Sequence, residues 1–160
     1  MPKVIPNTTP LISLLKVGKL HILRDLYGEI YIPYAVYNEV EAGRNKEFYS
    51  DLLKIDWIKI ENIKNPKSLS YFLDLDKGEA EAIVLASEIE ADLIILDENL
   101  GRFHAKHAGL KVTGTVGVLM KAKESGYIDA LKPILLQLRR NGVWLSEEFI
   151  EEVLQIAKEE

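Results

Sequence analysis

The apolar segment 93–96 constrains the fold most, because four apolar residues in succession lead directly into Asp97. A strand with one buried face alternates polar and apolar residues, whereas a continuous apolar run is typical of a strand buried on both faces. Such strands belong to parallel sheets that are covered by helices. The apolar spacing of the preceding segment 79–89 is helical, which fits that architecture. The pattern therefore predicts a parallel α/β sheet with Asp97 at the carboxyl end of one strand.

Strands and helices are expected to alternate along the rest of the chain. Short runs of β-branched, aromatic or other apolar residues predict strands at 4–5, 30–32, 57–60, 93–96 and 111–113. Helical spacing predicts helices at 10–17, 19–26, 33–40, 46–53, 79–89, 99–108, 116–124, 130–140 and 146–160, with a surface excursion at 62–70. Thr8 or Thr9 is expected to cap the first helix. This order predicts a three-layer, doubly wound parallel sheet in one domain over 1–160, with its core over about 1–125 and C-terminal helices over about 126–160.

Composition narrows the classes of function. The chain of 160 residues has no cysteine, which excludes disulfides and thiolate zinc sites. No apolar run approaches the roughly 20 residues needed to cross a bilayer, and the first residues lack the layout of a signal peptide, so we expect a cytoplasmic protein. The net charge of −5 is unusual for a nucleic-acid binder. Clustered carboxylates that bind cations would account for part of that charge.

Three polar residues are expected at one edge of the sheet. Asn7 and Asp97 each follow a predicted strand directly, and ligands of open α/β sheets bind beyond the carboxyl ends of strands. Glu79 begins the helix before the Asp97 strand. A helix of about 11 residues runs roughly 17 Å away from its start, and a strand of about five residues returns roughly 16 Å. The two lengths nearly cancel, so Glu79 is expected to meet Asp97.

Four segments in this order resemble the acidic sites of the PIN-domain superfamily. They are 4–12, with Asn7 at the first site, and 37–40, 78–83 and 96–98, with Glu39, Glu79 and Asp97. Segment 109–119 is similar to a prokaryotic PIN subgroup related to VapC-type toxins. The resemblance extends through about residue 125.

The resemblance implies an endoribonuclease that uses Mg²⁺ or Mn²⁺ and acts as the toxin of a toxin–antitoxin pair. A homodimer and an antitoxin protein would then be its partners. Asp97 and Asn7 would bind the metal directly, while Glu39 and Glu79 would bind through water or serve as general base. Asn7 stands where most PIN nucleases have aspartate, and its amide oxygen brings no negative charge.

The resemblance also implies supporting roles around these ligands. Thr9 would support the metal shell, and Glu98 and Arg102 would lie outside it. Thr115 would border the active edge. It belongs to the glycine-containing segment 114–117, for which close packing explains the composition better than phosphate binding, because the P-loop lysine is missing.

Structural roles remain open for each site residue. Asn7 would serve as a helix cap, Asp97 as a turn residue, Glu79 as a favourable charge at a helix N-terminus and Glu39 as a solvated helix residue. Two other functions also remain open. One is a PIN module that binds RNA or protein without catalysis, and the other is a small-molecule phosphotransfer enzyme that uses Asp97.

Overall fold

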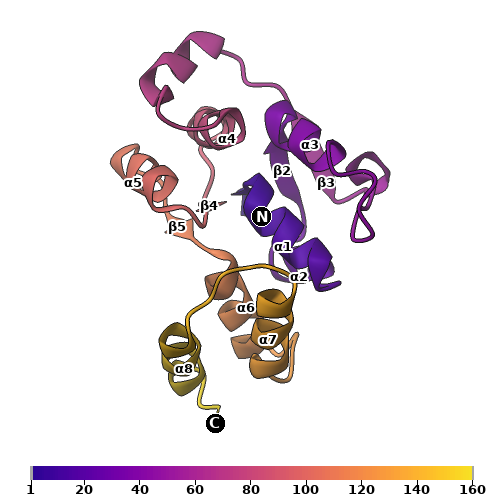
Figure 1. Cartoon of the computed structure of the whole chain (residues 1–160). Coiled ribbons are helices and arrows are strands. Elements are labelled where there is room, and N and C mark those ends of the chain that lie inside the picture. Colours follow the sequence, from indigo (N-terminus) through magenta and orange to yellow (C-terminus); the bar gives the residue numbers. More distant parts are fainter. Residues whose placement is uncertain (1, 160) are drawn as a thin grey trace.

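The computed structural model describes residues 2–159 and contains two parallel sheets (Figure 1). Their strands are β1 (Val4–Pro6), β2 (Ile30–Pro33), β3 (Ile58–Glu61), β4 (Leu93–Ile95) and β5 (Val112–Thr113). The first sheet has the order β1-β4-β5, and the second pairs β2 with β3. Strand β2 also packs beside β1, although the two are not hydrogen-bonded as a ladder. Every strand pair is parallel, as the buried run before Asp97 predicts.

Helices connect and cover these strands. The α-helices are α1 (Thr8–Lys16), α2 (His21–Tyr27), α3 (Tyr34–Glu41), α4 (Lys77–Glu88), α5 (Asn99–His107), α6 (Thr115–Glu124), α7 (Lys132–Arg140) and α8 (Glu147–Ile156). Two 3₁₀ helices, η1 (Leu52–Lys54) and η2 (Pro66–Phe72), lie in the connections. Within residues 2–159, no helix combines the length and apolar character that a membrane span requires.

The register of the first sheet brings three strand ends to one edge. Pro6 lies opposite Ile95, and Ile95 lies opposite Thr113. Beyond the strands, the Asn7 N–H donates to the Ile95 carbonyl at 2.9 Å, and the Leu96 N–H donates to the Thr113 carbonyl at 2.8 Å. The first turns of α1, α5 and α6 therefore start from the same edge.

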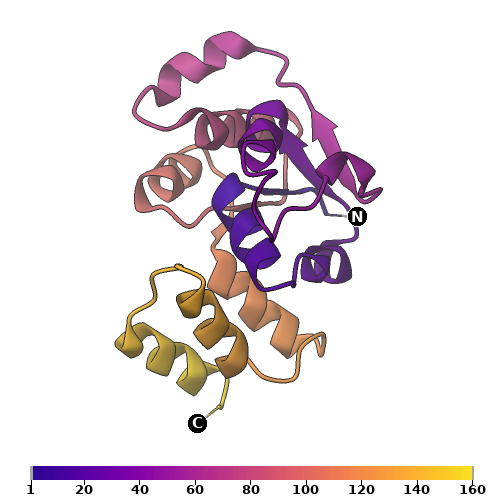
Figure 2. The same ribbon diagram turned by 45° about the vertical axis from the view of Figure 1, so that its right-hand side comes forward.

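Helix α4 is the central covering helix. It packs against β1, β2 and β4, and its apolar residues join the core that includes Ile5, Ile83 and Ile94. At the other end of the molecule, α6, α7 and α8 gather near the C-terminus, away from η2 (Figure 2). Parallel sheets flanked by helices confirm the predicted fold class.

Local structure differs from the sequence prediction in two places. The predicted helix at 46–53 is wrong, because the chain there forms turns followed by η1. Tyr49 bonds to Glu41, and Asp51 accepts from the Leu53 N–H at 3.1 Å, so local polar contacts replace the helical ladder. The predicted Thr cap of α1 is also wrong. Asn7 occupies the N-cap position, and its side chain makes no capping hydrogen bond.

Candidate active site

Asn7 is buried where β1 passes into α1, with 3% of its surface exposed. Its backbone lies at the N-cap of α1, yet its side chain caps nothing. The Oδ1 atom is buried and has no hydrogen-bond partner among the described residues. Helix capping therefore does not explain the amide, and a buried oxygen without a partner costs about 1–3 kcal/mol.

Glu39 is held by the starts of two other helices. It lies on α3, where the Thr8 hydroxyl donates to Oε1 and the Gly78 N–H donates to Oε2 at 3.1 Å. Thr8 follows Asn7, and Gly78 precedes Glu79. The two contacts thus bring the α3 carboxylate next to the residues that flank the other site positions.

A buried carboxylate on α4 supports the start of α3. Glu81 is 9% exposed, and its Oε1 accepts from the Ala35 N–H at 3.2 Å in the first turn of α3. This contact gives Glu81 a structural role at the start of α3. Glu81 thereby joins the helix that bears Glu39 to the helix that bears Glu79.

Glu79 lies in the first turn of α4 and is only 5% exposed. Its N–H donates to the capping carboxylate of Asp76 at 2.8 Å, but its own Oε2 is buried without a partner among the described residues. Burial, followed by the side-chain hydrogen bond with Asp76 and the charges of Asp76 and Glu98, raises the pKa of Glu79 to about 7. Part of the population is therefore protonated near neutral pH.

Asp97 lies at the carboxyl edge of β4 and binds the start of α6 with both oxygens. Oδ1 accepts from the Thr115 N–H at 2.7 Å, and Oδ2 accepts from the Thr115 hydroxyl at 2.6 Å. Arg102 lies beside this pair and donates to the Leu96 carbonyl at 3.3 Å. Both contacts keep the carboxylate and the guanidinium at the ends of β4 and β5.

Glycines make room for the carboxylates at this edge. A Cβ on Gly101, in the first turn of α5, would lie 2.5 Å from Glu79 Oε2 and 3.7 Å from Leu96 Cδ1. A Cβ on Gly114 would lie 2.8 Å from Asp97 Oδ1 and 3.1 Å from Arg102 Nη1. Close packing thus explains Gly114, as the sequence interpretation holds. The Gly101 contact also brings Glu79 against the helix that follows Asp97.

The side chains fit the chemistry of a hard divalent cation. Such cations bind carboxylate and amide oxygens, and Asn7 Oδ1 and Glu79 Oε2 are buried oxygens with no other partner among the described residues. Within residues 2–159, however, no three Asp, Glu or His side chains converge closely enough to form a complete metal cluster. The oxygens of Glu39 and Asp97 are held instead by Thr8, Gly78 and Thr115. The edge therefore offers suitable ligands, two of which have no competing hydrogen bond within residues 2–159.

For one supporting role, the structure favours the residue next to the one that the sequence predicts. Thr9, expected to support the metal shell, is exposed, whereas the hydroxyl that contacts a site carboxylate belongs to Thr8. Glu98 acts on the edge through its charge, which helps to raise the pKa of Glu79.

Sequence reasoning assigned no role in the site to several of the residues that hold the edge together, namely Thr8, Asp76, Gly78 and Gly101. Asp76 was detectable, because it stands three residues before Glu79 at a helix start.

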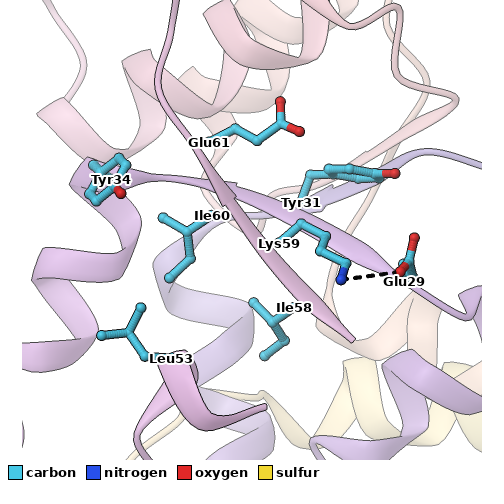
Figure 3. A pocket seen from close by; sticks show the side chains of 8 residues that line it. All are labelled: Glu29, Tyr31, Tyr34, Leu53, Ile58, Lys59, Ile60 and Glu61. Atoms are coloured by element: carbon cyan, nitrogen blue, oxygen red, sulfur yellow. Dashed lines mark ion pairs between the residues drawn. The ribbon is translucent and has the colours of Figure 1, made fainter. Parts of the chain in front are cut away.

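One groove opens beside Asp97. It has a volume of about 810 Å³, and Thr9, Asp97, Arg102 and Thr115 line one part of it. The other part is formed by α6, α8 and the loop before α8. A second hollow, shown in Figure 3, lies along β2 and β3, where Lys59 and Glu29 pair at 3.5 Å. It includes no residue predicted for the active site.

Comparison with known families agrees with this geometry. A family model described as PIN domain matches residues 3–159, which includes the C-terminal helices. No curated protein matches the chain significantly. PIN domains are commonly nucleases and generally use divalent metal ions. With nearly its whole length matched and the parallel fold in place, the chain belongs to the PIN-domain family.

Proposed function

We propose that this protein is an endoribonuclease that requires Mg²⁺ or Mn²⁺ and hydrolyses RNA phosphodiesters. The observation that carries the proposal is the pair of buried oxygens, Asn7 Oδ1 and Glu79 Oε2, that have no partner among the described residues. The Asn7 N–H donates to the Ile95 carbonyl. Glu79 Oε2 lies against Gly101, which also lies near the Leu96 side chain, so both oxygens belong to segments that adjoin the end of β4 before Asp97. A cation at this edge would satisfy both oxygens and offset the clustered negative charge.

Each of the four site residues would have its own role in metal binding or proton transfer. Asp97 and Asn7 would hold the cation, with Glu39 and Glu79 acting through water. Bound there, Mg²⁺ or Mn²⁺ would supply Lewis-acid polarisation of the phosphate and a lower pKa for an attacking water. With a pKa of about 7, Glu79 is suited to take the proton of that water. The water oxygen would bond to phosphorus as the phosphorus–oxygen bond to the leaving ribose breaks, and the leaving oxygen would take a proton from solvent water.

Cleavage of labelled RNAs tests the proposal directly. Purified protein is incubated with a mixed set of RNAs in Mn²⁺, Mg²⁺ or EDTA, beside an Asp97→Asn variant. We expect cutting that requires metal and that falls at least about a hundredfold in the variant. Asp56→Asn, a change at an exposed carboxylate outside the edge, is the matched control and should cut normally. Cutting that survives equally in Asp97→Asn would reject this site.

A binding module without catalysis is the second candidate, and two observations favour it. The first site position is the neutral Asn7, and both oxygens of Asp97 are engaged by Thr115. If the natural protein binds RNA without cutting it, Asn7→Asp distinguishes an attenuated nuclease from a module. New activity in that variant indicates an attenuated nuclease, whereas continued inactivity favours the module.

The role of toxin in a toxin–antitoxin pair belongs to the same proposal. It is supported by the similarity of segment 109–119 to VapC-type relatives, and it requires an antitoxin partner. Expression in a bacterial host tests it. Growth arrest by the natural protein but not by Asp97→Asn supports the toxin role, and normal growth with active protein counts against it.

A further inference from the structure

The groove beside Asp97 continues from the candidate active site onto the C-terminal helices. Asp97, Arg102 and Thr115 line it at the sheet edge. From there its lining continues over α6 to the loop that joins α7 and α8, and along α8. A substrate phosphate at Asp97 would therefore have one of its neighbouring nucleotides in this groove.

Apolar and aromatic side chains dominate the far part of the groove. They include Val116, Met120, Val143, Leu145 and Val153. Trp144 stands in the α7–α8 loop with 84% of its surface exposed, and Phe149 on α8 is 40% exposed. Leaving a tryptophan so exposed has a solvation cost that a stacking partner would recover.

The charges of the groove differ between its two ends. Among the charged residues that line it, Arg102 is the cation and lies beside Asp97, while Glu152 lies on α8. An RNA backbone would be repelled by Glu152, whereas a flat, uncharged base would not. The groove thus favours a phosphate at the sheet edge and a base toward α8.

We propose that the groove receives an unpaired base of single-stranded RNA next to the cleaved phosphate, and that Trp144 stacks on this base. The inference rests on the proposed ribonuclease function and deepens it by assigning a base-binding subsite to the groove. Exposed aromatic side chains stack on single-stranded bases with little sequence preference. Bases inside a duplex already stack on one another, so duplex RNA does not gain this contact.

Binding measured apart from cleavage tests this subsite. A fluorescein-labelled single-stranded RNA is titrated with protein in Ca²⁺, with the anisotropy giving Kd and a denaturing gel confirming intact RNA. Trp144→Ala should weaken binding about tenfold, whereas Trp144→Phe should stay within about threefold. Tyr127→Ala removes another aromatic side chain, 50% exposed and outside the groove, and should leave Kd unchanged. Circular dichroism checks that each variant is folded.

The same titration with duplex RNA separates stacking from general attraction. Trp144→Ala should have no effect on any duplex binding. An unchanged single-strand Kd in Trp144→Ala, an equal loss on duplex, or no single-strand binding by the natural protein would overturn the inference. The apolar groove would then be assigned to a segment of a protein partner instead of RNA. Trp144-dependent binding without cleavage in Mn²⁺ would uphold the RNA surface while rejecting the nuclease.

Discussion

At the scale of single residues, the candidate site contains two buried oxygens that lack hydrogen-bond partners in the described part of the chain. Asn7 Oδ1 and Glu79 Oε2 are both in this state among the described residues. Each such group lowers stability by about 1–3 kcal/mol. The carboxylates of Asp97 and Glu39 differ from these two oxygens, because each accepts hydrogen bonds from a threonine hydroxyl and a backbone N–H. The edge thus combines fixed carboxylates with oxygens that remain available to a ligand.

Glu79 should make the stability of the metal-free protein fall as pH rises. Its pKa is raised from 4.5 to about 7, so between these values the folded protein holds a proton that the unfolded chain has lost. By linkage, unfolding free energy decreases through that window, by an amount on the order of 1–3 kcal/mol. Urea unfolding at several pH values in EDTA should show this loss in the natural protein and not in Glu79→Gln.

An exposed glutamate supplies the control for that experiment. Glu151→Gln on α8 should retain the pH dependence of the natural protein, since it leaves Glu79 in place. Parallel stability curves for the natural protein and Glu79→Gln would contradict the assignment of the raised pKa.

Thr115 should matter through its hydroxyl. Thr115→Val removes the 2.6 Å hydrogen bond to Asp97 Oδ2 while leaving the backbone N–H in place. We expect a loss of about 1 kcal/mol in stability and about tenfold in Mn²⁺-dependent cleavage. Thr115→Ser keeps the donor and should restore both. Equal behaviour of the valine and serine variants would show that the hydroxyl has no positioning role.

At the scale of elements, helix starts assemble the site. The first turn of α6 donates an N–H to Asp97, and the first turn of α4 donates an N–H to Glu39. Helix N-termini favour negative charge because their first N–H groups have no partner within the helix. Helix α5 contributes differently, since Gly101 in its first turn lets Glu79 approach.

Gly101→Ala should destabilise the protein, although alanine normally favours helices. The added Cβ would lie 2.5 Å from Glu79 Oε2, so the buried carboxylate or α5 must shift. We expect a loss of about 1–3 kcal/mol by urea unfolding, as for other overpacked sites. Gly43→Ala is the matched control, because its nearest atom would lie at 3.5 Å, an ordinary contact.

A double variant identifies the cause of that loss. In a Glu79→Ala background the obstructing carboxylate is absent, so Gly101→Ala should become neutral or stabilising. An equal loss in both backgrounds would mean that the glycine acts through something other than Glu79.

At the scale of the whole molecule, a second apolar surface lies on η2 and α5, which we call the α5 patch. Its members are the exposed side chains of Tyr71, Leu73, Leu100 and Phe103. The two segments are joined by His104, which bonds to Asp74 and packs against Phe72. Exposed apolar groups of this kind mark association sites, and they support the expected homodimer.

Light scattering after size exclusion tests the dimer. The natural protein should run at twice the mass of one chain, and Phe103→Glu should shift it to the monomer, because a charge buried in an apolar interface is unfavourable. Tyr127→Glu alters another exposed aromatic side chain, outside the patch, and should remain dimeric. A monomeric natural protein would reject the homodimer, and an unchanged Phe103→Glu dimer would reject this surface.

The fold was largely predictable because its signals are local. The apolar run at 93–96 and the helical spacing of 79–89 each have a characteristic period, and both elements form. The prediction at 46–53 is wrong because helical spacing there is outweighed by contacts outside that segment, including the bond from Tyr49 to Glu41. Length arithmetic also brought Glu79 toward the end of β4, since helix and strand rises are nearly constant.

The sequence by itself determined the parallel architecture and the order of Asn7, Glu39, Glu79 and Asp97 along the chain, because periodicity and strand ends are local properties. Only the tertiary structure decided which site oxygens accept hydrogen bonds and which have no partner among residues 2–159. Hydrogen bonds from Thr8, Gly78 and Thr115 join residues far apart in sequence. It also decided the pKa of Glu79 and the exposure of Trp144, since burial depends on how all elements pack together.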